Sequence, residues 1–214
     1  QGESNRGQEE LYGRLMPAFV KDLRQKWGLG DFPFYYVQIA PFQYDGVDKT
    51  SSAKLRVVQL RNMNEIPNSG MAVTLDIGEK TKIHPAEKEK VGNRLAYWAL
   101  AKTYNKNNFG YSGPIYKSIE IKGNKIYVNF SNAPKGVAPL ETELPDFEIA
   151  GEDKIFYPAK AVIEAKSGRL GVSSPQVHNP VAVRYAYKNF VVGSLFDVYG
   201  LPASSFRSDN WEIK

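Results

Sequence analysis

The sequence of 214 residues has no cysteine, only two histidines and three methionines. The lack of cysteine excludes a disulfide framework, a thiolate zinc site and a cysteine nucleophile, although it does not decide the compartment. No stretch approaches the roughly 18 consecutive apolar residues that a membrane span requires. We therefore expect a soluble chain with no membrane partner.

The sequence also lacks any stretch in which charges of one sign are concentrated. The 28 basic and 23 acidic residues are scattered along the chain and leave a net charge of +5, so no nucleic-acid groove is indicated. The sequence contains no metal-ligand cluster, no glycine-rich phosphate loop and no cofactor fingerprint. We expect neither a metal nor a cofactor.

Apolar residues at four-residue steps predict a helix over residues 9–27. Pro17 predicts a kink or a restart within it. The steps fall on Leu11, Leu15, Phe19, Leu23 and Trp27.

Two apolar runs, over residues 33–40 and 71–77, are too continuous for strands with one wet face and predict buried parallel strands. Between these two runs, Ser51 and Ser52 are expected to cap a helix that ends near Met63. Pro85 is expected to begin a third helix. Alternating helices and buried strands predict a doubly wound parallel sheet, with sites in loops beyond the carboxyl ends of the strands.

From about residue 109 the pattern changes to short alternating strands separated by glycine, proline and asparagine turns. Residues 122–125 have the composition of a hairpin turn. We interpret residues 109–214 as a β-sandwich-like module. The aromatic clusters at 34–36 and 97–98 are assigned to the core, because they fall on a strand and a helix.

Several blocks, in this order, resemble the sialate O-acetylesterases of the SGNH or GDSL hydrolase superfamily, over nearly the whole chain. The blocks are Gln1-Gly2-Glu3-Ser4-Asn5, Asn68-Ser69-Gly70-Met71-Ala72-Val73, Asp76-Ile77-Gly78, Ile83-His84-Pro85, Ala182-Val183-Arg184-Tyr185 and the C-terminal segment 200–209. The resemblance implies that residues 1–108 are the C-terminal part of a three-layer α/β/α hydrolase domain, with a partial doubly wound sheet. Residues 109–214 would form the β-rich module with the family's C-terminal segment.

The resemblance implies an esterase that removes O-acetyl groups from sugars through a serine, a histidine and an acyl-enzyme intermediate. His84 is the candidate base, because a neutral imidazole can take the serine proton and return it to the leaving alcohol. A lone histidine is more often structural, so the motif around it carries this assignment. His178 is assigned to a surface loop.

The nucleophile is the main difficulty. The Gly-Gln-Ser-Asn type of block that carries it in the family is missing from these residues, so we expect it upstream, in the N-terminal part of the same protein. Ser4 is a rival, although a serine beside asparagine in a turn more often bonds the backbone. The resemblance assigns the rest of the first block, Gln1, Gly2, Glu3 and Asn5, to the oxyanion hole or to substrate binding. For Gln1 a disordered terminus is the alternative.

The triad acid is open, because Thr81 and Lys82 stand where relatives have an acidic residue. Asp76 and Glu79 are the nearby candidates. Asp76 is also placed to accept backbone donors at a strand end, and a serine–histidine dyad with a carbonyl that orients the ring is equally tenable.

The expected partners are an O-acetylated sugar or glycan, with sialic acid first, and the N-terminal part of the same protein. An acetylxylan esterase-like enzyme and a non-catalytic carbohydrate-binding or structural remnant are the alternatives. A glycan substrate suggests a secreted or periplasmic protein. A chain without the first strands of such a sheet would expose a wide apolar edge, so we expect it to be stable only with its N-terminal complement. Arg207, Asp209 and Trp211 either line a sugar pocket or clasp the hydrolase sheet.

Overall fold

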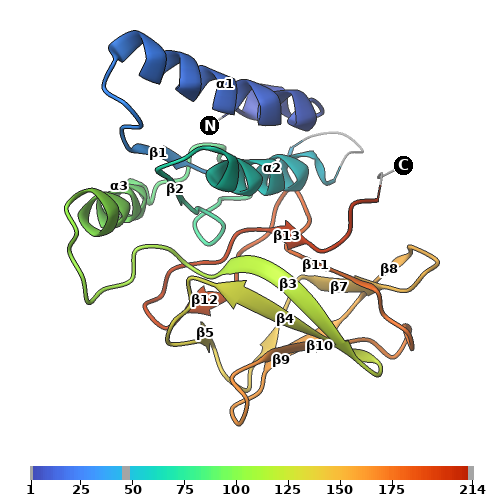
Figure 1. The fold of residues 1–214 in the computed structure, drawn as a ribbon. Coiled ribbons are helices and arrows are strands. Elements are labelled where there is room, and N and C mark those ends of the chain that lie inside the picture. Colours follow the sequence, from blue (N-terminus) through green and yellow to red (C-terminus); the bar gives the residue numbers. More distant parts are fainter. Residues whose placement is uncertain (1, 45–48, 212–214) are drawn as a thin grey trace. The chain divides into compact units, whose positions relative to one another are not determined.

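Two compact units make up the chain (Figure 1). The first, the α/β unit, comprises residues 1–112 and 188–192, and the second, the antiparallel unit, comprises residues 113–187 and 193–214. The computed structural model describes residues 2–44 and 49–211. None of the described helices is long and apolar enough to cross a membrane.

The α/β unit is built on two parallel strands. Strand β1 (Phe34–Val37) pairs with β2 (Ser69–Ala72). The Tyr36 hydroxyl donates to the Gln59 carbonyl of helix α2 (Ser51–Glu65) at 2.6 Å, whereas the Tyr35 ring stacks on Trp98 of helix α3 (Lys88–Trp98). Adjacent strand residues point to opposite faces, so helices cover both faces of this pair.

The contact between α3 and β2 depends on a glycine. A Cβ atom at Gly70 would collide with the indole ring of Trp98. The ring lies so close that its Nε1–H donates to the Met71 carbonyl at 3.0 Å. Gly70 therefore admits the largest side chain of α3 to the strand surface.

Helix α1 (Glu9–Trp27) has the predicted limits and ends at Gly28, whose φ of 66° is left-handed. It runs through Pro17 without a second start, so the predicted restart does not occur. Gly13 and Val20 are buried along α1, and a Cβ at Gly13 would lie 3.0 Å from Val58 of α2.

Part of the apolar pattern that predicts α1 faces away from α2. Leu11, Leu15 and Phe19, which we call the α1 stripe, are 41%, 53% and 55% exposed, and Trp27 is 63% exposed. An apolar helix face normally lies against a core. In the part of the chain that the structure describes, this face is left open to solvent.

Two helix starts differ from the sequence prediction. Thr50 occupies the N-cap of α2, with no side-chain capping hydrogen bond, and Ser51 and Ser52 form its first turn. The Ser52 hydroxyl donates instead to the side-chain oxygen of Asn189 at 3.1 Å. Helix α3 begins three residues after Pro85 and passes into a π-helical turn (η2, Ala99–Thr103).

The antiparallel unit holds a five-stranded sheet in the order β3-β4-β10-β9-β6, a four-stranded sheet in the order β13-β11-β7-β8, and the pair β12-β5. The predicted hairpin is confirmed, since β3 and β4 flank it and Gly123 has φ 58°. The bounds are β3 Ile115–Lys122, β4 Lys125–Ser131, β5 Val137–Ala138, β6 Glu143–Leu144, β7 Phe147–Ala150, β8 Phe156–Pro158, β9 Lys160–Ile163, β10 Leu170–Ser173, β11 Ala182–Tyr185, β12 Phe196–Asp197 and β13 Phe206–Arg207.

Aromatic rings join the two larger sheets. Phe206 of β13 stacks on Tyr116 of β3 with centroids 4.9 Å apart, and packs edge-on against Phe130 of β4. On its own sheet it contacts Phe147 and Tyr185. Such rings bury large areas and prefer offset or edge contacts, so this cluster forms the centre of the unit.

Candidate functional site

His84 lies in the segment 73–87 that leaves the carboxyl end of β2 and reaches α3; we call this segment the His84 loop. Its side chain is exposed. Within the described residues its ring takes part in no hydrogen bond or ion pair, so its position follows from the loop backbone. An exposed imidazole in this loop is accessible to a substrate or to a further protein segment.

Residues 2–5 form the N-terminal turn, in which Glu3–Asn5 is a 3-10 helix (η1). Gly2 has φ 126°, and a Cβ there would lie 2.6 Å from the Tyr12 ring, so only glycine fits. Ser4 is exposed, and its hydroxyl makes no hydrogen bond to any described residue, so backbone bonding by this serine is not observed. Gln1 lies outside the described residues.

A short segment after β1 contacts both regions. The Arg6 guanidinium, just beyond the N-terminal turn, lies 3.3 Å from the Tyr44 ring centroid and donates to the Ser51 hydroxyl at 3.0 Å. The neighbouring Gln43 N–H donates to the Lys80 carbonyl of the His84 loop at 3.2 Å. The N-terminal turn and the His84 loop are thus tied to the same segment, at the carboxyl ends of the strands.

Asp76 is held by an arginine. Arg94 of α3 donates from Nη1 to Oδ1 and from Nη2 to Oδ2 of Asp76, both at 2.7 Å, and the side chains are only 8% and 12% exposed. Nη1 also donates to the Val73 carbonyl at 2.7 Å. No role was predicted for Arg94 from the sequence.

Glu79 closes the tip of the same loop. Its Oε1 accepts the Ala86 N–H at 2.8 Å, and Lys82 lies 3.4 Å from Oε2. The backbone hydrogen bond from Ala86 and the interaction with Lys82 lower the pKa of this carboxyl. In the described part of the chain, neither Glu79 nor Asp76 bonds to His84, so the structure does not bring the candidate acids to the candidate base.

A buried polar layer supports the strand ends, and sequence reasoning missed it. The Gln59 side chain accepts the Ile39 N–H at 3.0 Å, and Thr74 donates to the Gln38 carbonyl at 2.9 Å. Arg56, which is fully buried, donates to Ser52 at 3.1 Å. This layer could have been predicted from polar residues that interrupt the apolar segments, since a polar side chain that is buried there has to bond a partner.

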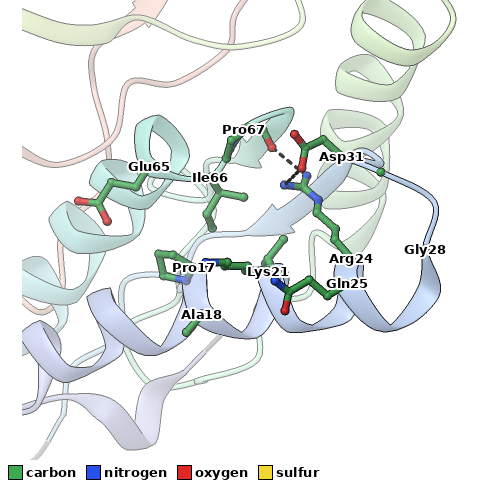
Figure 2. A pocket seen from close by; sticks show the side chains of 12 residues that line it. Pro17, Ala18, Lys21, Arg24, Gln25, Gly28, Asp31, Glu65, Ile66 and Pro67 are labelled. Atoms are coloured by element: carbon green, nitrogen blue, oxygen red, sulfur yellow. Dashed lines mark hydrogen bonds and ion pairs between the residues drawn. The ribbon is translucent and has the colours of Figure 1, made fainter.

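A cavity of about 690 Å³ lies elsewhere, between α1 and the end of α2. Figure 2 shows Arg24 at its wall, where it donates to the Pro67 carbonyl at 2.8 Å and lies 3.5 Å from Asp31. Asp31 and Pro67 precede β1 and β2, so the cavity is at the amino ends of the strands. No predicted site residue lines it, and sites of doubly wound sheets lie at the opposite ends.

The remaining candidates fall in the antiparallel unit. His178 is exposed in the stretch between β10 and β11, as a surface-loop assignment requires. Asp209 is bound by Arg184 of β11 and by Arg207, and the Arg207 guanidinium also donates to the Trp211 carbonyl at 2.6 Å. The C-terminal segment is therefore clasped to β11 of its own unit. Among the described residues, no three His, Cys, Asp or Glu side chains gather where they could hold a metal.

Comparison with known proteins identifies relatives that match from 61% to 94% of this chain. Residues 1–101 match the family model described as carbohydrate esterase, sialic acid-specific acetylesterase. The human sialate O-acetylesterase is 28% identical over 206 residues, which cover 87% of this chain and 39% of the human protein, and the mouse enzyme is 28% identical over 148 residues, 61% of this chain and 27% of the mouse protein.

The crystal structure of a carbohydrate acetylesterase from Xanthomonas citri has a TM-score of 0.85 and 34% identity to this chain. The match covers 94% of this chain and 46% of that one, so the chain spans less than half the length of each of these three relatives. These homologues are carboxylic ester hydrolases. The chain is therefore related to the sialic acid-specific acetylesterases among the carbohydrate esterases, and residues 1–101 carry the match to that family.

Proposed function

We propose that the protein removes O-acetyl groups from sugars, with O-acetylated sialic acid as the first candidate substrate and acetylated xylan as the neighbouring one. The observation that carries this proposal is the exposed His84 in a braced loop at the carboxyl end of β2, within a domain of the acetylesterase family. Ligands of doubly wound sheets bind at that end.

In the proposed mechanism, His84 takes the proton of a serine hydroxyl while the serine oxygen attacks the acetyl carbonyl. The same proton passes to the sugar oxygen as the ester bond breaks, and water then releases acetate from the acetyl-serine by the reverse sequence. The serine belongs to a segment outside these 214 residues, because no nucleophile block of the family's type occurs in them. Ser4 is the alternative nucleophile.

The N-terminal turn supplies the proposed oxyanion or substrate contacts, through Gln1, Gly2, Glu3 and Asn5. Backbone and amide N–H groups suit a tetrahedral oxyanion, and removing one such donor typically costs a hundredfold or more in rate. The attachment of this turn to the segment that also contacts the His84 loop supports the assignment.

The fold proposed for the whole domain is the three-layer SGNH arrangement, followed by a β-sandwich-like module. A pair of parallel strands is too small to be stable by itself. Among the described residues, β1 is paired on one side only, and the α1 stripe is uncovered. Further strands from the same protein, placed beside β1 and beneath the α1 stripe, would complete the sheet.

The test uses the protein expressed together with the segments that flank these residues in its gene. It should release acetate from an O-acetylated sugar and from an aryl acetate, and His84→Ala should reduce kcat at least a thousandfold with the fold retained. His178→Ala is the matched control, because it removes the other histidine of the chain, and its activity should stay within twofold. Undiminished turnover in His84→Ala would refute the role of His84.

A second candidate function is a non-catalytic carbohydrate-binding or structural remnant. It is favoured by the engagement of Asp76 and Glu79 away from His84 and by Thr81 and Lys82 where an acid is expected. Glycan binding by the same protein without any acetate release would select this candidate.

A glycan substrate outside the cytoplasm places the proposed enzyme in a secreted or periplasmic location. Fractionation of the source cells, followed by detection of the protein in the medium or periplasm, tests this proposal. Recovery only from the cytoplasm would contradict it.

A further inference from the structure

The His84 loop is long and has little regular structure, yet it carries the residue on which the proposed function depends. Fifteen residues that belong to neither a strand nor a helix separate the end of β2 at Ala72 from the start of α3 at Lys88. Loops of this length are mobile unless their backbone is tied to the scaffold. Because the ring of His84 has no partner of its own among the described residues, the ties of the loop decide where it stands.

The firmest of these ties is at the base of the loop. Arg94 contacts Asp76 with both terminal nitrogens and reaches the Val73 carbonyl with one of them, all at 2.7 Å. The planar guanidinium fixes both the distance and the orientation of a carboxylate that it binds in this manner. Both partners are nearly buried, so solvent screens the pair little.

A second tie lies at the tip, where Glu79 accepts the Ala86 N–H. His84 lies between these two residues in the sequence, and the Gln43 N–H bond to the Lys80 carbonyl holds the same stretch from the side of β1. The path from β2 to His84 is therefore fixed at its base, on its flank and at its tip.

We infer that Arg94 and Asp76 are a positioning pair for His84, and that Asp76 acts as a brace of the loop and not as the acid of a catalytic triad. The inference rests on the proposed esterase function. Catalytic rates are sensitive to such support, since a displacement of about 1 Å far from the chemistry can cost on the order of a hundredfold.

Arg94→Met and Asp76→Asn in the protein with its flanking segments separate the two roles. As a positioning pair, each variant should lower kcat by about 10- to 100-fold with KM within about threefold, and the double variant should be no worse than the poorer single one, because both remove the same tie. Lys90→Gln is the matched control, since it breaks an exposed ion pair with Glu87 from the α3 side, and kcat should stay within twofold.

The comparison of the two variants is the readout that distinguishes a triad acid from a brace. A triad acid acts directly on the imidazole, so its loss would be felt without any change at Arg94. A fall in kcat of about 10⁴-fold in Asp76→Asn, with kcat unchanged in Arg94→Met, would overturn the inference and make Asp76 the triad acid.

Two further measurements keep the test decisive. If Arg94→Met does not fold, Arg94→Lys takes its place, because lysine keeps the positive charge but cannot bind both carboxylate oxygens of Asp76 at once. If the parent protein hydrolyses no acetyl ester, the proposed function fails, and amide exchange of residues 77–86 tests the brace alone. That exchange should accelerate at least tenfold in the Arg94 variant, and unchanged exchange would refute the positioning role.

Discussion

Arg184 and Asp209 are joined by two hydrogen bonds, from Nε at 2.9 Å and from Nη2 at 2.8 Å, with the Asp209 side chain fully buried. Arg207 binds the same carboxylate, and the Arg184 guanidinium stacks 3.8 Å from the Phe156 ring centroid. The end of the chain is thereby fastened to β11. Removing one partner of a buried pair leaves the other charge uncompensated.

Asp209→Ala should therefore lower the free energy of unfolding by about 3–5 kcal/mol, measured by urea denaturation. Glu143→Gln in the same unit is the control. It breaks an exposed pair with Lys160 and should cost less than about 1 kcal/mol. Equal losses of unfolding free energy in the two variants would show that the buried Asp209 contacts stabilise the fold no more than an exposed ion pair does.

The same carboxyl predicts a pH dependence. Burial alone would raise the pKa of Asp209, but the hydrogen bonds and charges of Arg184 and Arg207 lower it below its ordinary value. Because the folded pKa is the lower one, the stabilisation is fully present above the unfolded pKa of about 3.9 and is lost as the pH falls through the folded pKa. Stability between pH 5 and pH 2 should decline less steeply in Asp209→Asn than in the parent.

Gly70 and Gly92 should respond to alanine with opposite signs. At Gly70 the added Cβ meets the Trp98 ring, and such overpacking typically costs about 1–3 kcal/mol. At Gly92 on α3 nothing lies within 4 Å of the added atom, and alanine in a helix gains about 0.5–1 kcal/mol. Thermal melts of both variants check this pair, and a stabilised Gly70→Ala would show that the Trp98 contact is looser than described.

The α1 stripe should make the isolated 214-residue chain self-associate, because exposed apolar residues along one helix face form an adhesive patch. Leu15→Lys combined with Phe19→Lys should shift its sedimentation profile toward the monomer. Lys21→Gln with Gln25→Lys, also on α1, is the control and should leave self-association unchanged. In the protein with its flanking segments, the stripe variant should lower stability, whereas a neutral effect there would mean that no segment covers α1.

Glu79→Ala should free the tip of the His84 loop. The Ala86 N–H loses its acceptor, so its hydrogen exchange at constant pH should accelerate by about tenfold or more. Glu87→Ala, which removes a carboxylate from an exposed pair, should leave the Ala86 exchange unchanged. Slow Ala86 exchange in Glu79→Ala would indicate that another group protects this amide.

Local patterns predicted the regular elements well. The four-residue apolar spacing located α1 to the residue, and the Gly123–Asn124 turn located the hairpin of β3 and β4, because both signals act within a few residues. The strand pair was predicted as parallel, but β1 is shorter than the run over residues 33–40, and β2 begins at Ser69 and shares only Met71 and Ala72 with the predicted strand over residues 71–77. Beyond Val37 and Ala72, side chains such as Gln59 and Thr74 take over the backbone hydrogen bonds.

The partners of charged residues were not predictable in this way. Asp76 and Glu79 were chosen as candidate acids because they precede His84 in the sequence, yet one binds Arg94 on the next helix and the other binds a backbone amide of the loop. Ser51 and Ser52 were expected to cap α2, but Ser52 is bonded to Asn189, 137 residues away. Sequence proximity carries no information about which of several polar neighbours the fold brings within 3 Å.

The sequence by itself determined the helices, the parallel character of the strands, the change to antiparallel structure after about residue 109 and the family resemblance, because each is written in short-range periodicity or in an ordered set of motifs. Only the tertiary structure decided that the α1 stripe is uncovered, that Arg94 braces the His84 loop and that the C-terminal segment is clasped to β11. These features depend on which distant surfaces meet and which charges are buried together, and burial sets the strength of an ion pair far more than residue type does.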